Sequence, residues 1–351
     1  MDFFRGKRVF LTGHTGFKGA WLSVILNQLG AKVYGYSLPP EDGSLFIEAG
    51  IDQFVDGQLS DIMDRRELHA SLLRFQPEII IHMAAQPLVS EGFKAPVETI
   101  ETNVVGTAKL LDIAKTLSNL ETILVVTSDK CYENKDQSYA FAEEDRLGGK
   151  DPYSASKAMQ ELVVATFQNS FFSDEASPNL ISARAGNVIG GGDVCRDRLV
   201  PDLLRCVSAN KLLRLRNPKA TRPWQHVLEP LFGYLKYIEY SSNPKADKVD
   251  TLNFGPRDNS VITVHELVRL FEGHLNTSFD IEEVPGSFDE AKVLKLNISK
   301  SEDKIHWEPL LDIEDAVKLT VEFFYSPHKL EIMKIQIASY LDKIHFSETD
   351  K

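Results

Sequence analysis

The amino-acid sequence predicts an α/β fold, a doubly wound parallel sheet with a smaller C-terminal lobe. Three observations lead to this prediction. Short apolar segments alternate with helical patterns in the first half, a glycine-rich loop joins the first apolar segment to the first helix, and the alternation weakens in the second half. Continuous apolar strands separated by helices are typical of parallel sheets with both faces covered.

The elements of the first half follow in a regular order. We expect strands at residues 8–13, 32–38, 78–85, 123–128 and 180–188. The helices between them are expected at 17–30, 64–75, 96–117 and 153–172. In such sheets, ligands bind at the carboxyl ends of the strands, so the segments that follow the strands are candidates for a site.

The second half predicts a smaller lobe that packs on the first. Helical patterns cover residues near 264–275, 312–325 and 329–343. No Pro/Gly/Ser-rich linker separates the halves, so a hinge-linked module is not expected. We assign residues 1–185 to a dinucleotide-binding domain and 186–351 mainly to a substrate-binding lobe, with some segments returning to the first domain.

The composition excludes several classes of protein. A net charge of −12 argues against a nucleic-acid partner or an anionic membrane surface. The cysteines, Cys131, Cys195 and Cys206, are too scattered for a disulfide framework or a metal site, and the histidines show no ligand spacing. The chain shows no leader pattern and no apolar run of about 18 residues. We therefore expect a cytoplasmic protein without a metal site.

The glycine-rich loop is the first candidate binding element. Gly13, Gly16 and Gly19 stand between a predicted strand and a predicted helix. Glycines let a pyrophosphate approach the backbone, and a helix N-terminus offers N–H donors. The spacing GxxGxxG differs from the GxGxxG of most dinucleotide folds, and a plain glycine-rich turn is the alternative.

The second predicted strand bears on the choice between NAD and NADP. It ends in Tyr36, Ser37 and Leu38, with neither an acidic residue for the ribose hydroxyls nor an Arg for a 2′-phosphate. The sequence thus favours NAD without excluding NADP. Asp61 and Ile62 are candidates to flank the adenine, and the alternative for them is an ordinary helix cap.

Tyr153 and Lys157 are the candidate catalytic pair. A spacing of i, i+4 on the helix begun by Asp151 and Pro152 puts them on one face. We expect the ammonium to favour the phenolate and to lower the pKa of Tyr153, so that the phenol can act as a base. A surface Tyr and Lys on an amphipathic helix would show the same spacing.

The segment TSDK supplies further candidate groups. Thr127, Ser128, Asp129 and Lys130 follow a predicted strand at the ligand edge of the sheet. A hydroxyl, a carboxylate and an amine in one turn can supply a donor, an acid and a base. A helix cap with a solvated lysine is the alternative.

With these motifs, the chain resembles the extended short-chain dehydrogenase/reductases, and within them the CDP-glucose 4,6-dehydratases. The resemblance rests on TGHTGFKGAWL, HMAAQPLVSEGFKAPVETIETNVVGT, TSDKCYEN, DPYSASKAMQELV, ARAGNVIGGGD and RNPKATRPWQHVLEPLFGYL. It implies a Rossmann-type fold and a tightly bound NAD. It places at the cofactor Gly13, Thr15, Gly16, Phe17, Lys18, Gly19, Ser37, Asp61, Ile62, Ala84, Ala85, Gln86, Asn103, Thr127, Tyr153 and Lys157. It places at a nucleotide-diphosphate hexose Gln86, Asn187, Arg198, Arg216, Arg222, Trp224 and His226.

The resemblance also implies a reaction. NAD takes hydride from C4 of the glucose while Tyr153 removes the C4 hydroxyl proton; water is eliminated across C5 and C6, and hydride returns to C6. We expect Asp129 to act as the acid for the leaving hydroxyl and Lys130 as the C5 base, with Ser128 and Lys157 completing the catalytic set. Better-known relatives carry Asp-Glu where this chain carries Asp-Lys, so Lys130 either removes the proton or only stabilises the enolate.

Other functions remain open at this point. A sugar-nucleotide 4-epimerase shares the glycine loop and the Tyr-Lys pair but needs no elimination groups. A UDP-sugar 4,6-dehydratase fits the same motifs, and a non-catalytic cofactor-binding regulator could do without the Tyr-Lys pair. From the habit of the family, we expect a homodimer, with a tetramer as the alternative.

Overall fold

The computed structural model describes the chain except for residues 1, 136–138, 175, 210–211, 285–292 and 350–351. A seven-stranded parallel sheet in the order β10-β6-β5-β4-β1-β2-β3 forms its centre. Its strands are β1 (Arg8–Thr12), β2 (Lys32–Ser37), β3 (Asp56–Leu59), β4 (Ile79–His82), β5 (Thr122–Val126), β6 (Asn179–Ala185) and β10 (Thr251–Phe254). The predicted doubly wound sheet is confirmed.

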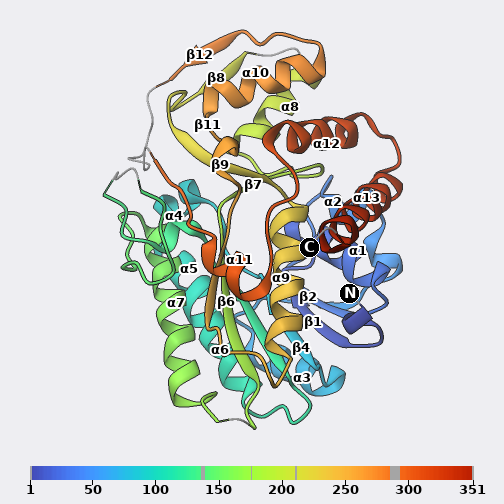
Figure 1. Cartoon of the computed structure of the whole chain (residues 1–351), viewed down its shortest axis with the longest axis vertical. Helices are drawn as coiled ribbons and strands as arrows, with labels where there is room; N and C mark the ends of the chain where they lie inside the picture. The colour runs from blue at the N-terminus through green and yellow to red at the C-terminus, as the bar shows by residue number, and fades with distance from the viewer. Residues whose placement is uncertain (1, 136–138, 175, 210–211, 285–292, 350–351) are drawn as a thin grey trace.

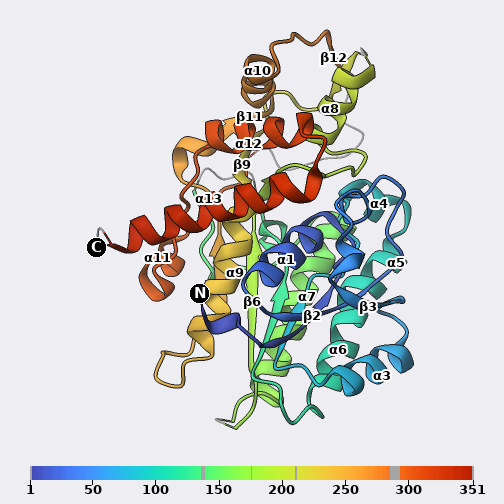
Figure 2. The ribbon, with the colours of Figure 1, turned by 90° about the vertical axis from the view of Figure 1, so that its right-hand side faces the viewer.

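Helices cover both faces of this sheet because alternate strand residues point to opposite sides. Val9 and Leu11 belong to one buried apolar cluster, and Phe10 belongs to the other. The first face is covered by α1 (Phe17–Gln28) and α9 (Leu228–Ser241). The second face is covered by α3 (Arg65–Phe75), α6 (Gly106–Ala114) and α7 (Pro152–Ser170) (Figures 1 and 2).

Residues beyond 186 build a second lobe at one end of the sheet (Figure 1). Its strands form a sheet of β11 (Val261–Thr263), β9 (Thr221–His226) and β7 (Asn187–Ile189), and a pair of β12 (Ile281–Glu283) and β8 (Leu213–Leu215). Its helices are α8 (Leu199–Ala209), α10 (Val264–Leu275) and α12 (Ile313–Tyr325).

Several later segments return to the first lobe. Strand β10 extends the main sheet beside β6, and α9 packs against one face of this sheet. Helix α11 (Ser299–Ile305) contacts both of them, and α13 (Lys329–Thr349) lies along α1. Smaller helices, α2 (Leu45–Glu48), α4 (Val89–Lys94) and α5 (Pro96–Ile100), lie in the connections.

The predicted boundaries need two corrections. The helix expected at 96–117 consists of α5, a π-helical turn η3 (Glu101–Val105) and α6. The strand expected at 180–188 breaks at Gly186, and its two parts join different sheets. At Gly186 a Cβ would lie 3.1 Å from the Pro223 side chain, so the chain crosses between the lobes where β9 comes close.

The helical patterns of the second half were predicted well where they were recognised. Helices α10 and α12 follow the expected ranges, and α13 continues past its expected end at residue 343 to Thr349. Helix α9 was missed, although it is one of the main helices against the sheet. Among the described residues, no helix is long and apolar enough to span a bilayer.

Candidate active site

A large cavity lies where the carboxyl ends of the main strands meet the second lobe. Its volume is about 1410 Å³. Segments after β1, β2, β3, β4, β5 and β6 line one side, and residues of α8, β8 and β9 line the other. The strand order reverses between β1 and β4, which is the place where doubly wound sheets bind their ligands. The space exceeds a usual small-molecule pocket and suits two adjoining ligands.

The glycine loop forms one end of the cavity. Gly13 has a φ of +77°, in the left-handed region that favours glycine. A Cβ on Gly19 would lie 2.0 Å from the Gly13 carbonyl oxygen, so only glycine fits there. Gly16 directly precedes α1, whose first N–H groups face the loop. Thr15, Phe17 and Lys18 line the same cavity, so the loop has the backbone and helix N-terminus that a pyrophosphate needs.

The ends of β2 and β3 continue this wall. Ser37, Asp61 and Ile62 all line the cavity, as expected. The hydroxyls of Ser37 and Thr15 are 2.8 Å apart. Asp61 Oδ1 accepts a bond of 2.8 Å from the backbone N–H of Met63, so this carboxylate also has the local capping role that was the alternative.

The turn after β5 places its polar groups at the floor of the cavity. Ser128, Asp129 and Lys130 line it, and the Ser128 hydroxyl donates to Asp129 Oδ1 over 3.0 Å. The second oxygen, Oδ2, is buried and has no hydrogen-bond partner among the described residues. Burial raises the pKa of Asp129, while Lys130, Ser128 and Arg222 act against this rise. The carboxyl group therefore holds a proton more readily than an ordinary Asp and can serve as an acid.

Tyr153 and Lys157 project from the first turns of α7 into the same cavity. The Asp151 side chain caps this helix by accepting from the Ser154 N–H over 2.9 Å. Lys157 Nζ donates to Gln160 Oε1 over 2.9 Å. Burial lowers the pKa of Lys157 to about 8, against the effect of nearby acidic groups.

The expected effect of Lys157 on Tyr153 is not what the structure shows. Burial raises the pKa of the Tyr153 phenol to about 12, and a hydrogen bond with Ser128 only partly offsets this. Desolvation of the phenolate outweighs the neighbouring charges because the side chain is only 7% exposed. In this structure the phenol is thus a weaker acid than the sequence led us to expect.

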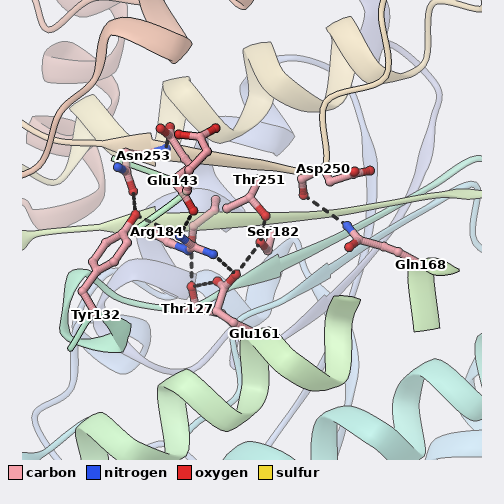
Figure 3. A network of polar contacts seen from close by, with 12 residues as sticks. Thr127, Tyr132, Glu143, Glu161, Gln168, Ser182, Arg184, Asp250, Thr251 and Asn253 are labelled. Carbon is pink, nitrogen blue, oxygen red and sulfur yellow. Dashed lines mark hydrogen bonds and ion pairs between the residues drawn. The ribbon is translucent and has the colours of Figure 1, made fainter. Parts of the chain in front are cut away.

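A buried polar network lies directly behind the catalytic turn (Figure 3). Glu161, one turn after Lys157 on α7, forms an ion pair of 2.7 Å with Arg184 on β6. The Thr127 hydroxyl donates to Glu161 Oε1, and Ser182 donates to Oε2 over 3.0 Å. Thr127 was expected at the nicotinamide ribose or the substrate. It lines the cavity, but its hydroxyl proton is used in holding β5 to α7.

The substrate-side candidates come from the second lobe and mostly converge on the cavity. Asn187, Arg198, Arg216, Arg222 and Trp224 all line it. The guanidinium groups of the three arginines suit the oxygens of a diphosphate. Trp224 Nε1 is buried and has no hydrogen-bond partner in the part of the chain that the structure describes, so this donor could meet a ligand.

Three candidates lie outside the cavity lining. Gln86 is held by its own neighbours, since its amide donates to Thr99 Oγ1 over 2.8 Å. Asn103 is fully buried in the π-helical turn, where it accepts from Gln86 N and donates to Gln86 O. His226 is fully buried at the end of β9, with its ring packed edge-on against Trp21. Ala84 and Ala85 do line the cavity, on the loop that Asn103 holds in place.

The structure also reveals contacts that the sequence did not indicate. Lys18 turns its ammonium toward Tyr234 of α9, with Nζ 3.1 Å from the phenolic oxygen. Burial, together with Arg198 and Lys157, lowers the pKa of Lys18 to about 7. Arg198 is held by Asp193 over 3.0 Å. No local pattern marks the contact of Lys18 with Tyr234, because it joins segments far apart in the chain, whereas Asp193 and Arg198 belong to one loop. Among the described residues, no cluster of three or more His, Cys, Asp or Glu could hold a metal ion.

Comparison with known proteins identifies the family. The family model described as GDP-mannose 4,6 dehydratase matches residues 10–320. The chain belongs to this family. It is 44% identical over 331 residues to a CDP-glucose 4,6-dehydratase of Salmonella typhimurium, covering 92% of this chain and 91% of that protein. It is 24% identical to a dTDP-glucose 4,6-dehydratase of Xanthomonas campestris, covering 90% and 92%.

Solved structures of the family share the fold. The dTDP-glucose 4,6-dehydratase of Bacillus anthracis in complex with NAD superposes with a TM-score of 0.78 at 21% identity, covering 91% of this chain and 96% of that one. The UDP-glucose 4-epimerase of Thermotoga maritima with UDP-glucose gives a TM-score of 0.80 at 18% identity, covering 90% and 98%. Dehydratases and epimerases thus share this architecture, and the reaction must be argued from the residues of the site.

Proposed function

We propose that this protein is an NAD-dependent CDP-glucose 4,6-dehydratase, a hydro-lyase that converts CDP-glucose to CDP-4-keto-6-deoxy-glucose and water. One observation carries the choice of reaction. The cavity that holds Tyr153 and Lys157 also holds Asp129, whose pKa is raised, and Lys130 beside it. An acid and an amine next to the oxidation pair are what an elimination needs and a simple epimerisation does not.

The residues around the glycine loop fit a dinucleotide. Gly13 and Gly19 keep the loop close to α1, and Ser37 and Asp61 lie where the adenosine half would extend. When bound there, NAD would accept hydride from C4 of the sugar and return it to C6. The cavity offers no Arg beside Ser37 at the end of β2 for a 2′-phosphate, which favours NAD over NADP.

The remaining chemistry belongs to side chains of the protein. Tyr153 would remove the proton of the C4 hydroxyl, with Lys157 positioned one helical turn away. Asp129 would donate a proton to the departing C6 hydroxyl, consistent with its raised pKa. We assign to Lys130 the removal of the C5 proton before water leaves and the return of a proton to C5 when hydride adds to C6. The Ser128 hydroxyl bonds both the Asp129 carboxyl and the Tyr153 phenol and can give its single proton to either, so it aligns the acid with the base.

The second lobe would hold the nucleotide. Arg198, Arg216 and Arg222 line the cavity from the second lobe and would meet the diphosphate, while Asn187 and Trp224 would contact the sugar or base. The choice of cytidine rests on the 44% identity to the Salmonella enzyme.

The test is a panel of substrates. Purified protein is incubated with CDP-, UDP- and TDP-glucose, with and without added NAD, and the 4-keto product is measured. A 4-keto-6-deoxy product from CDP-glucose supports the proposal. Conversion to a C4 epimer without loss of water would assign an epimerase, and a preference for UDP-glucose would assign the UDP-sugar dehydratase.

We further propose a homodimer in a cytoplasmic setting. Three apolar side chains stay exposed on neighbouring helical segments: Val97 on α5 at 62%, Val105 on η3 at 39% and Leu162 on α7 at 56%. Covering them with the same face of a second copy would bury this apolar area. Light scattering would distinguish a dimer from a tetramer or a monomer. Among the described residues, no cysteine forms a disulfide, which favours a reducing compartment.

A further inference from the structure

An unbroken chain of hydrogen bonds joins the base of the glycine loop to Lys157. Thr12 Oγ1 lies 2.7 Å from His82 Nδ1, and His82 Nε2 lies 2.9 Å from Thr107 Oγ1. Gln160 Nε2 donates to Thr107 Oγ1 over 2.8 Å, and Gln160 Oε1 accepts from Lys157 Nζ over 2.9 Å. None of the five side chains is more than 3% exposed. The chain therefore crosses the buried core from β1 through β4 and α6 to α7 and reaches the cavity at Lys157.

The direction of each bond follows from Thr107. Its hydroxyl donates its one proton to the carbonyl oxygen of Asn103 over 2.7 Å. Thr107 Oγ1 must therefore accept from both His82 and Gln160, which uses its two lone pairs. His82 consequently carries its proton on Nε2.

The other ring nitrogen of His82 must then accept. The Thr12 hydroxyl already accepts from the N–H groups of Met83 and Ala84, each over 3.0 Å, so its own proton is available for His82 Nδ1. A proton on both ring nitrogens would leave Thr12 facing three donors. Burial, and to a lesser extent Lys157, lowers the pKa of His82 to about 3, in agreement with a neutral ring.

This polarity determines what Lys157 meets. Because the amide nitrogen of Gln160 is held by Thr107, its oxygen must face the Lys157 ammonium. If the amide turned over, an N–H group would face the ammonium and disfavour its charge. At the other end, Thr12 immediately precedes Gly13, so the same bonds fix the start of the glycine loop relative to the lysine.

We propose that His82, Thr107 and Gln160 are positioning residues. They orient the side-chain oxygen of Gln160 toward Lys157 and fix the position of this lysine relative to the glycine loop. The inference rests on the proposed function in taking Lys157 as part of the cofactor site. It adds residues that lie outside the cavity lining and that act only through Lys157 and Thr12.

Other groups also influence the charge of Lys157 and stay constant in the test. Glu161 on α7 and Cys131 in the turn after β5 favour the ammonium. Lys18 on α1 and His82 on β4 are linked to Lys157 by charge as well. Changing Thr107 alters none of these ionisable groups.

The first experiment compares Thr107→Val with Thr320→Val. Thr320, on α12, is equally buried, and its hydroxyl donates to Ala316 O over 2.7 Å in the same i−4 pattern. In Thr107→Val the amide of Gln160 loses its anchor, so the pKa of Lys157 falls. We expect the alkaline limb of the kcat profile to move about one pH unit lower and kcat to fall roughly tenfold.

Thr107→Ser keeps the hydroxyl, so the alkaline limb of the pH profile and kcat should both match those of the native protein. Thr320→Val should change neither quantity. An unmoved alkaline limb in a folded Thr107→Val protein, or equal effects of the two valine variants, would overturn the proposal. The Kd for NAD from calorimetry is expected to rise in Thr107→Val alone.

The second experiment examines His82 itself and needs neither cofactor nor substrate. Nitrogen-15 NMR of labelled histidine, with the His82 signal assigned by its loss in His82→Gln, should show a neutral Nε2–H ring that does not titrate from about pH 5 to 9. An Nδ1–H tautomer or a titrating ring would overturn the assignment. If the NMR and NAD-binding results hold while CDP-glucose is not turned over, the proposed function fails and the positioning role stands.

Discussion

The carboxylate of Glu161 and the guanidinium of Arg184 lie 2.7 Å apart, 2% and 5% exposed, directly behind the turn that carries Asp129. Each partner is satisfied further. Glu161 accepts from Thr127 and Ser182, and Arg184 donates to Tyr132 and to the carbonyl of Glu143 (Figure 3). The pair therefore holds β5, β6 and α7 at the positions from which the catalytic side chains project.

Replacing Arg184 should lower the free energy of unfolding. Arg184→Met leaves the Glu161 charge buried without a partner, which costs about 3–5 kcal/mol of unfolding free energy. The additional change Glu161→Leu should recover part of that loss. As a control, Arg214→Met removes an exposed pair with Glu282, and we expect less than about 1 kcal/mol. Urea unfolding measures all three, and equal losses for the two arginine variants would contradict the assigned role.

Tyr153→Phe should leave the fold intact and remove the base. The phenol is nearly buried, so Phe fills the same space. We expect kcat with CDP-glucose to fall by about 10²–10⁴-fold, the usual contribution of a positioned base. NAD affinity measured by calorimetry should change much less. A variant that kept more than a tenth of the native turnover would exclude Tyr153 as the base.

Ser128→Ala tests the hydrogen bond to the phenol. Burial raises the pKa of Tyr153 to about 12 even though this bond offsets part of the rise. The base acts when it is deprotonated. Loss of the hydrogen bond from Ser128 should therefore raise the pKa of Tyr153 and move the rising limb of the pH profile of kcat to higher pH, by up to about one unit. The pH profiles of the native and variant proteins are compared, and a limb that stays in place or moves lower would contradict the role.

The sequence predicted those features that depend on local pattern. The alternation of apolar strands and helices indicated the parallel sheet, and the carboxyl ends of those strands placed Gly13, Ser37, Asp61 and Ser128 at one cavity. Strand ends in a parallel sheet share an edge, so spacing along the chain was sufficient for this step.

Features that depend on tertiary contacts were not predicted. Burial, and not the adjacent ammonium, dominates the pKa of Tyr153, and burial is set by segments distant in sequence. The family resemblance placed His226 at the substrate, but β9 carries its ring away from the cavity lining to Trp21. The bonds of His82 join three elements, β1, β4 and α6, so a lone histidine in an apolar strand gave no sign of them.

Lys130→Ala separates the two stages of the reaction. If Lys130 removes the C5 proton, oxidation at C4 stays detectable by trapping the ketone with hydroxylamine, while exchange of the C5 hydrogen with solvent deuterium is abolished. Lys150, which is exposed and outside the cavity lining, provides the control Lys150→Ala, with no expected effect on either stage. Retained C5 exchange in Lys130→Ala would assign that proton to another group or to water.

Glu229 should make stability depend on pH. It is fully buried on α9, where it accepts from the N–H groups of Leu310 and Leu311 and from the Tyr340 hydroxyl. Burial raises its pKa from 4.5 to about 7. The folded state thus holds the proton of Glu229 more tightly than the unfolded chain does. The contribution of Glu229 to the free energy of unfolding is therefore complete below about pH 4.5 and is lost as the pH rises to about 7.

The difference between these pKa values corresponds to roughly 3 kcal/mol across that window. Glu229→Gln keeps an acceptor for the two N–H groups but cannot ionise. We expect the variant to lose this part of the pH dependence and to be more stable than the native protein at pH 8. Glu322→Gln, on the exposed side of α12, is the matched control. Urea unfolding between about pH 5 and 8 provides the test, and an unchanged slope in Glu229→Gln would show that Glu229 titrates normally in the folded protein.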